Sequence, residues 1–263
     1  MTGPVLWLVL AYIGSLAALL IAAFWRIDGF TTKLVHDWNL GNFRELWRRS
    51  VYRTIAVRTV GVAVAVTVID MLIAVPMAFT MAKIMKPTRR RMAVVGVLMP
   101  LWSSYLVKSY AWRTIFIKGG VLDWVGLASP GFGISATVVL LSYLWLPYMI
   151  LPIYAGFERL PNSLLEASAD LGGKTLRTFR SVTLPMIKPS IIAGSIFTFS
   201  LTLGDYIAVN IVGGKSQFLG NTVYANFGSA NNLPLAAALS TIPVVVMVVY
   251  LTSIRRSGAL ENL

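Results

Sequence analysis

The sequence of 263 residues has no cysteine and only one histidine, His36. Disulfide bonds, thiolate metal sites and cysteine nucleophiles are therefore excluded, and a single histidine argues against a histidine metal cluster or a Ser/His triad. Charged residues are also scarce, at 13% against 57% hydrophobic residues. This apolar share is higher than that of typical soluble domains. It predicts a polytopic membrane protein with no separate soluble domain, no catalytic residue and no metal site.

Acidic residues are few in comparison with basic ones. Asp and Glu number 10 against 23 Lys and Arg, which gives a formal net charge of +13. Such an excess is typical of nucleic-acid-binding proteins, but no nucleic-acid motif accompanies it here. In a membrane protein, lysine and arginine at the water interface face anionic lipid. We therefore expect membrane lipid, and no nucleic acid, as the partner of this charge.

Six apolar segments are long enough to cross a hydrocarbon core of about 30 Å, which takes about 20 residues. We expect spans at residues 5–25, 59–82, 92–117, 134–155, 190–212 and 235–254. The spans must be helices, because unpaired backbone groups are not tolerated in lipid, and the alternation typical of an outer-membrane barrel is absent. The predicted fold class is an all-α membrane protein with six transmembrane helices in one domain, residues 1–263.

The ends of the chain are expected on the cytoplasmic side. An even number of spans places both termini on one side, and the basic cluster KIMKPTRRR (residues 83–91) favours the cytoplasm for that side, although the overall bias of lysine and arginine is weak. The first segment lacks a basic n-region and a small-residue cleavage site, so we expect it to be retained. Residues 42–58 have aromatic and aliphatic side chains at helical spacing between arginines, which predicts an interfacial helix or a lead-in to the second span.

A polar segment, residues 156–189, separates the fourth and fifth spans. Asn162 is placed to cap a helix that begins at Ser163, with Glu166 in the region that favours a negative charge. Gly172 and Gly173 are expected to end this helix with a left-handed residue. A second short helix over residues 175–182 would end at Leu184-Pro185.

Two short helices joined by a glycine corner form a knob that fits a cleft of another protein. Small side chains at residues 167–169 permit close approach of a partner's backbone. The alternative is an ordinary amphipathic connector between two spans.

The same segment resembles the EAA loop, by which permease subunits of bacterial ABC importers dock on their ATPase subunits. The pattern E-A-x-x-x-x-G, nine residues, an aliphatic residue, one residue and L-P falls on Glu166, Ala167, Gly172, Val182, Leu184 and Pro185. Ser168 replaces the second alanine of the pattern, and Val182 the usual isoleucine. The resemblance implies a type I ABC importer permease fold with a cytoplasmic coupling-helix loop. It assigns the ATPase contact to Glu166, Ala167, Ser168, Asp170, Leu171, Gly172, Leu184 and Pro185.

Other stretches are similar to the spermidine/putrescine branch of these permeases. They are PLWSSYLVKSYAWRTIFIKGGVLD (100–123), SLTLGDYIAVNIVGG (200–214) and FLGNTVYANFGSANNLPLAAALS (218–240). Leu233 stands where that branch commonly has tryptophan. The resemblance covers residues 42–254 and implies that the cargo is spermidine, putrescine or a similar cationic solute.

Two acids inside predicted spans are candidates for contact with that solute, because ionisable residues within a membrane are costly and mark functional sites. Asp205 lies about 23 Å along the fifth span from Ser190 at 1.5 Å per residue, and Asp70 lies near the middle of the second span. A polycation needs carboxylates in place of water and aromatic faces for cation–π contacts of about 0.5–2 kcal/mol each. The candidate solute-path residues are Asp205, Tyr206, Trp102, Tyr105, Tyr110, Trp112 and Asp70.

Each of these assignments has an alternative. Asp70 could bond to a neighbouring span, and the aromatic residues at span ends could form an interfacial belt. Lys108 and Arg113 in the third span would repel a cation unless an acid pairs with them.

ATP chemistry is not expected in this chain, because the phosphate-loop pattern G-x-x-x-x-G-K-[ST] is absent. The resemblance implies that no cofactor is bound here and that partner ABC ATPase subunits bind ATP and Mg²⁺. Further implied partners are a second permease subunit, which we expect to be a different chain, and an extracytoplasmic substrate-binding protein. The implied location is the bacterial cytoplasmic membrane.

Three alternatives to a polyamine importer remain open. The same machinery could carry another solute, such as an amino acid derivative, thiamine, a phosphonate or iron. An ion-coupled carrier or channel would predict inverted repeats, which the sequence does not show. An intramembrane enzyme would require a His/Cys/Ser constellation, which it also lacks.

Overall fold

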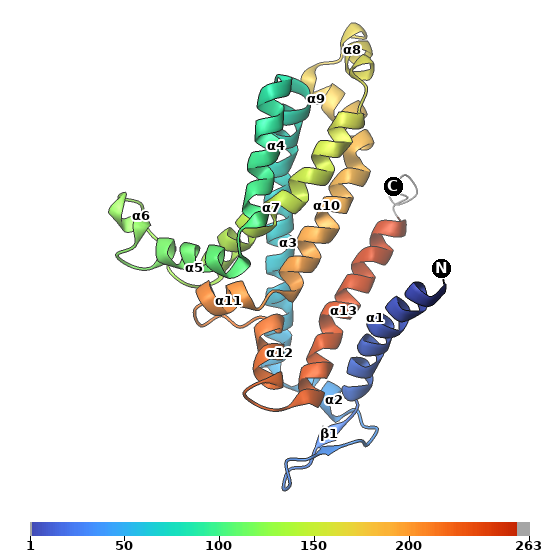
Figure 1. Cartoon of the computed structure of the whole chain (residues 1–263), viewed down its shortest axis with the longest axis vertical. Helices are drawn as coiled ribbons and strands as arrows, with labels where there is room; N and C mark the ends of the chain where they lie inside the picture. Colours follow the sequence, from blue (N-terminus) through green and yellow to red (C-terminus); the bar gives the residue numbers. More distant parts are fainter. Residues whose placement is uncertain (1, 257–263) are drawn as a thin grey trace.

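The computed structural model describes residues 2–256, most of which are helical (Figure 1). The long helices are α1 (Thr2–Ala22), α3 (Ser50–Phe79), α4 (Pro87–Trp102), α7 (Ile134–Arg159), α10 (Leu184–Gly204) and α13 (Leu233–Arg256). The shorter helices are α2 (Gly41–Arg48), α5 (Tyr105–Phe116), α6 (Val121–Trp124), α8 (Asn162–Asp170), α9 (Thr175–Thr178), α11 (Ile207–Val212) and α12 (Leu219–Phe227). Two π-helical turns, η1 (Thr80–Ile84) and η2 (Phe179–Thr183), extend α3 and precede α10. Strands β1 (Arg26–Ile27) and β2 (Leu34–Val35) pair antiparallel, with Arg26 opposite Val35.

Five continuous helical stretches of the described residues are long and apolar enough to cross a membrane, and α4 with α5 makes a sixth candidate. The five stretches are Val5–Ala22, Ser50–Ile84, Ile134–Arg159, Thr175–Gly204 and Leu233–Arg255. This agrees with the predicted all-α membrane fold.

The third and fifth spans are not the single helices that the hydropathy pattern predicted. The expected span 92–117 bends by 94° between α4 and α5, where Ser103 and Ser104 adopt extended backbone. Serine side chains compete with helical hydrogen bonds, and Pro100 removes a donor from the last turn of α4. The expected span 190–212 stops at Gly204, and α11 follows after an extended Asp205.

The core lies between α3, α7 and α10, which pack on one another in the centre of the molecule (Figure 1). Small residues permit this packing. Ala74 and Ala78 of α3 are fully buried against Met149 and other residues of α7. A Cβ added to Gly194 of α10 would lie 3.1 Å from the backbone of Met149, so the two helices approach closely there.

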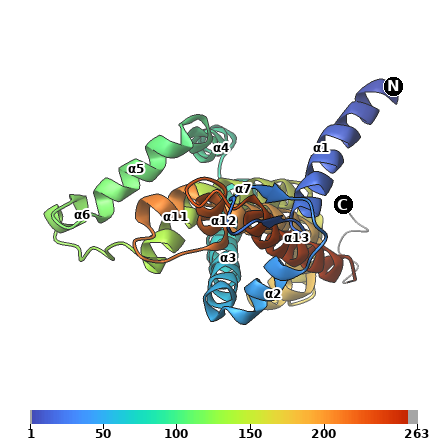
Figure 2. The ribbon, with the colours of Figure 1, turned by 90° about the horizontal axis from the view of Figure 1, so that it is seen from below.

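Two parts of the chain extend away from this core (Figure 2). Helix α1 packs against α13 through residues near its C-terminal end, such as Leu19 and Ala22, while apolar side chains nearer its start, such as Val5 and Ile13, are exposed. On the other side, α5 and α6 lead outward from the break after α4. The apolar surface of α1 is typical of a helix that faces lipid or another membrane subunit.

The two ends of the molecule differ in structure (Figure 1). Helices α8 and α9 project at one end, and the β1–β2 pair with α2 lies at the other. The N-terminal end of α1 and the C-terminal end of α13 both point toward the end that carries α8 and α9. The predicted interfacial segment 42–58 is divided at Arg49 into α2 and the start of α3, and Asn42 ties α2 to the end of α1 by donating to the carbonyl oxygens of Ala23 and Trp25 at 2.8 Å.

Candidate functional site

The polar segment between α7 and α10 folds into a knob, defined here as residues 162–178 with helices α8 and α9. Its glycine corner is as predicted, because Gly172 has a φ of +76°. The Gly172 amide donates to the Ala169 carbonyl and the Gly173 amide to the Ser168 carbonyl, both at 2.8 Å. This is the Schellman arrangement that ends a helix at a left-handed glycine. A contact of 2.8 Å between the hydroxyl oxygens of Ser168 and Thr178 then joins α8 to α9.

Two details of the predicted knob are wrong. Helix α8 begins at Asn162, after Pro161, and the Asn162 side chain does not cap it. That side chain accepts a hydrogen bond from Lys83 Nζ at 2.9 Å instead. Leu184-Pro185 does not end the second helix, because α9 continues through η2 into α10. Pro185 lies in the first turn of α10, where its missing N–H is tolerated.

The knob presents exposed apolar and acidic side chains on its surface. Leu171 is 90% exposed and Leu176 62% exposed. Glu166, Ala167 and Asp170 of α8 are exposed as well, and within residues 2–256 neither acid forms an ion pair. Exposed leucines beside unpaired carboxylates form a surface suited to contact with another protein.

A second site lies where the two broken spans meet. Asp205 follows the last residue of α10, and its Oδ2 accepts a hydrogen bond from the hydroxyl of Tyr105, the first residue of α5. Its Oδ1 accepts a hydrogen bond from the amide of Ala208 in α11 at 2.9 Å. One carboxylate thus joins the break between α4 and α5 to the break between α10 and α11. Only 9% of Asp205 is exposed.

A row of aromatic rings extends from this junction. Tyr105 stacks on Trp145 with ring centroids 5.8 Å apart. Trp145 contacts Tyr148 at 6.0 Å, and Tyr148 contacts Phe197 at 6.4 Å. Trp145, Tyr148 and Phe197 were not among the residues predicted from the sequence. The available signal was a tryptophan and a tyrosine three positions apart inside a span, since both carry a polar group that is costly in lipid.

The remaining solute-path candidates lie in different surroundings. Tyr206 is beside Asp205 and stacks on Tyr224 at 4.9 Å. Trp102 and Tyr110 are on the surface, at 78% and 55% exposure. Trp112 packs against Phe116 and Tyr143, at 5.1 and 5.3 Å. The structure therefore brings Tyr105, Tyr206 and Asp205 to one junction and leaves Trp102, Tyr110 and Trp112 outside it.

The two cations that would oppose a cationic solute have local partners other than an acid. Lys108 Nζ donates to the carbonyl oxygen of Pro100 at 2.8 Å, across the break between α4 and α5. The Arg113 guanidinium lies 5.6 Å from the centre of the Phe132 ring.

Asp70 is separate from this junction. It is fully buried in α3, and in the part of the chain that the structure describes neither of its carboxylate oxygens has a hydrogen-bond partner. Ser142 of α7 is a polar neighbour, and its hydroxyl is likewise buried without a partner among these residues. The structure thus places Asp70 inside the bundle, next to Ser142 of α7.

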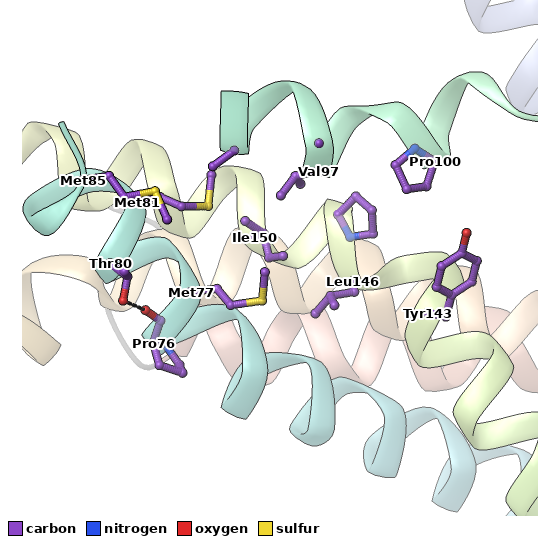
Figure 3. Close-up of a pocket in the computed structure, with 13 residues that line it drawn as sticks. Pro76, Met77, Thr80, Met81, Met85, Val97, Pro100, Tyr143, Leu146 and Ile150 are labelled. Carbon is purple, nitrogen blue, oxygen red and sulfur yellow. Dashed lines mark hydrogen bonds between the residues drawn. The ribbon is translucent and has the colours of Figure 1, made fainter. Parts of the chain in front are cut away.

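An elongated cavity of about 590 Å³ lies between α3, α4 and α7 (Figure 3). Met77, Met81 and Met85 line it from α3 and the residues that follow, and Pro100 and Tyr143 lie at its far end. The hydroxyl of Thr80 is bonded to the Pro76 carbonyl oxygen at 2.8 Å. Because none of the described residues that line this cavity carries a carboxylate, they provide no counter-charge for a cation.

Most of the chain matches a known protein family. The sequence model of the family described as "Binding-protein-dependent transport system inner membrane component" matches residues 60–259. The "Inner membrane ABC transporter permease protein YdcU" of Escherichia coli (strain K12) is 41% identical over 99% of this chain and 89% of its own length. The "Spermidine/putrescine transport system permease protein PotB" of Haemophilus influenzae is 32% identical over 84% of this chain and 78% of its own.

A solved structure has the same fold. A chain from the crystal structure of a bacterial alginate ABC transporter, in complex with a periplasmic protein bound to an alginate pentasaccharide, superposes with a TM-score of 0.72. The match covers 97% of this chain and 92% of the other, at 16% sequence identity. At this identity the similarity concerns the fold.

Proposed function

This chain belongs to the family of binding-protein-dependent transport system inner membrane components, and we propose that it carries a small organic polycation, spermidine or putrescine, into the cell. It is an integral inner-membrane protein and a non-catalytic permease subunit of an ABC importer, whose ATPase is a separate subunit. What we propose is the identity of the cargo and the surfaces that contact the partner subunits.

The knob is proposed as the contact with the ATPase subunits, which bind ATP and Mg²⁺. Its exposed leucines and unpaired acids support this role, since they offer an apolar and charged surface on a rigid corner. The N-terminal end of α1 and the C-terminal end of α13 point toward the knob (Figure 1). We therefore assign all three to the cytoplasmic side. At the opposite end, the β1–β2 pair and α2 would face an extracytoplasmic binding protein.

The chemistry of the junction at Asp205 supports a cationic cargo. A nearly buried carboxylate at the point where two broken spans meet, beside Tyr206 and a row of aromatic rings, supplies the counter-charge and the faces that bind alkylammonium groups. The relative that is 32% identical is named for spermidine and putrescine. A second permease subunit, expected to be a different chain, would complete the pathway.

The cargo is tested by uptake. The permease pair, its ATPase and its binding protein are reconstituted in proteoliposomes with ATP inside and radiolabelled spermidine or putrescine outside. We expect ATP-dependent uptake that unlabelled polyamine competes away. A binding protein that binds no polyamine, with no uptake above that of vesicles lacking ATP, would reject this cargo.

The contact with the ATPase is tested separately. The double substitution Glu166→Lys and Gly172→Asp reverses one exposed charge and places a side chain on a left-handed residue. We expect the variant to insert into the membrane normally, to lose co-purification with the ATPase and to lose transport. Unchanged transport would remove the knob from the coupling mechanism.

Another cargo on the same machinery is the second candidate. The relative that is 41% identical is named a permease without a stated solute. An amino acid derivative, thiamine, a phosphonate or iron would each appear as a binding-protein ligand in the same assay.

A further inference from the structure

Lys83 connects three elements at the base of the knob. It lies in η1, and its Nζ donates to the carbonyl oxygen of Leu160 at 2.5 Å and to Oδ1 of Asn162 at 2.9 Å. Leu160 is the residue that ends α7, and Asn162 is the first residue of α8. The last carbonyl groups of a helix lack partners within the helix, and a cation is favourable at that end. One ammonium group thus holds the end of α3–η1 against the turn from α7 into the knob.

A second set of polar contacts holds α4 at the same place. Glu158, in the last turn of α7, accepts a hydrogen bond from the Tyr154 hydroxyl at 2.6 Å and lies 3.4 Å from the Arg90 guanidinium of α4. The ends of α3, α4 and α7 that lie nearest the knob are therefore tied together around Leu160 and Glu158.

Two of the spans that meet near the knob, α3 and α10, change helix type at its base. Helix α3 passes into η1, and α9 passes through η2 into α10. Single π-helical turns are rare and occur frequently at functional sites, since they disturb the regular hydrogen-bond ladder. These turns are suited to local changes of angle between the spans and the knob.

Packing alone does not hold the knob against α3. An apolar cavity of about 870 Å³ separates them, lined by Val75 and Phe79 of α3 and by Leu165 and Leu176 of the knob, among others. Leu165 packs at the edge of the core cluster that contains Ala78 of α3, but the cavity interrupts this packing. A polar contact that crosses directly from η1 to the base of α8 is a stiffer link.

We propose that Lys83 is a positioning residue for coupling. Through its bonds to Leu160 and Asn162, it makes α3 move with α7 when the knob is displaced. This inference rests on the proposed role of the knob as the contact with the ATPase. It concerns how movement of the knob reaches the spans, and it assigns no ATPase contact to Lys83.

The test compares Lys83→Met with three other variants in the reconstituted full transporter. Lys83→Arg keeps donors for both acceptors, Asn162→Leu removes one of the two bonds, and Lys86→Met removes a neighbouring exposed cation at the start of α4. Three quantities are measured: co-purification of the ATPase, basal ATP hydrolysis and solute imported per ATP hydrolysed. The last quantity separates coupling from stability, because loss of folded protein lowers transport and stimulated hydrolysis together.

For Lys83→Met we expect normal co-purification and a fall in solute imported per ATP of at least about fivefold, the lower end of typical coupling between sites. Asn162→Leu should give a smaller fall, Lys83→Arg should restore most of the ratio, and Lys86→Met should match the wild type. A wild-type ratio in Lys83→Met would overturn the inference, as would an equal fall in Lys86→Met. If Lys83→Met does not assemble, an unchanged ratio in Asn162→Leu overturns it instead. Failure of the wild-type chain to bind any ATPase would reject the proposed function and is a different result.

Discussion

The glycine corner of the knob allows a quantitative prediction, because Gly172 is needed for its backbone conformation alone. Its φ is +76°, and a Cβ added there would meet no atom within 4 Å. Gly172→Ala therefore introduces no clash. For an L-residue, the left-handed region costs roughly 1–2 kcal/mol. The substitution therefore destabilises only the left-handed conformation of the corner, which the proposed ATPase contact requires.

The strain lowers the affinity by its full amount when the corner is only marginally stable in the free permease, as is expected for two short exposed helices. If the ATPase binds only the knob with its corner formed, the apparent dissociation constant rises as the population of that conformation falls. At about 1.4 kcal/mol for each factor of ten, 1–2 kcal/mol corresponds to a loss of roughly 5- to 30-fold. Gly172→Asn should lose less than the alanine variant, since asparagine enters the left-handed region more readily.

The measurement is the dissociation constant between the purified ATPase and the permease in nanodiscs, by biolayer interferometry. Gly61→Ala is the matched control, because Gly61 lies inside α3 with an ordinary φ and an added Cβ there also meets nothing within 4 Å. It should bind as the wild type does. Gly172→Ala binding within twofold of the wild type, or Gly61→Ala binding as weakly as Gly172→Ala, would refute the reasoning.

Three further predictions concern other parts of the chain. Asp205→Asn should reduce spermidine uptake by roughly 10- to 100-fold, as the loss of a charge-assisted hydrogen bond of about 1.5–3 kcal/mol implies. Tyr105→Phe, which leaves the carboxylate in place, should reduce uptake less, and equal uptake in Asp205→Asn and the wild type would exclude Asp205 from the path. Gly194→Ala should lower the thermal unfolding midpoint in detergent, because its Cβ would lie 3.1 Å from the Met149 backbone. Overpacking of this kind costs about 1–3 kcal/mol. An unchanged midpoint would contradict the close approach of α7 and α10. Hydrogen bonds from the Thr31 amide and hydroxyl and from the Phe30 amide lower the pKa of Asp28 in the β1–β2 loop. Because the folded pKa lies below the unfolded value of about 3.9, this carboxylate stabilises the loop above that pH, and the stabilisation is lost as the pH falls through the lowered pKa. Hydrogen exchange at the Thr31 amide should show this loss in the wild type and not in Asp28→Asn.

The sequence was sufficient for the features that depend on composition and local chemistry. Apolar segments of sufficient length predicted the membrane helices, and two adjacent glycines predicted the corner at Gly172. The breaks at Ser103-Ser104 and at Asp205 were not predicted. Hydropathy indicates how long an apolar segment is, but not whether its helix axis bends. Because apolar residues continue on both sides of each break, the hydropathy pattern does not reveal either one.

The site was only partly predictable, because its contacts join distant parts of the chain. Asp205 and Tyr105 were both identified as candidates, but their hydrogen bond links residues 100 positions apart. Trp145 and Tyr148 were not identified, because nothing in the sequence of α7 indicates that they join a row of rings with Tyr105 of another helix. The predicted cap at Asn162 was wrong for the same reason. Its side-chain oxygen accepts a hydrogen bond from Lys83, 79 positions away, and does not cap α8.

The burial of Asp70 has a consequence for how the protein is made. In the finished molecule, this carboxyl group is fully buried and Ser142 of α7 is its polar neighbour, yet α7 is synthesised after α3. During insertion α3 therefore enters the membrane before the helices that will shield its acid exist, at a cost of about 2.5–3.5 kcal/mol for an aspartate at the centre of a helix. The apolar residues around Asp70 must offset that cost alone, and assembly with α7 later removes the group from lipid. The order of synthesis thus makes the insertion of α3 sensitive to any further polar residue.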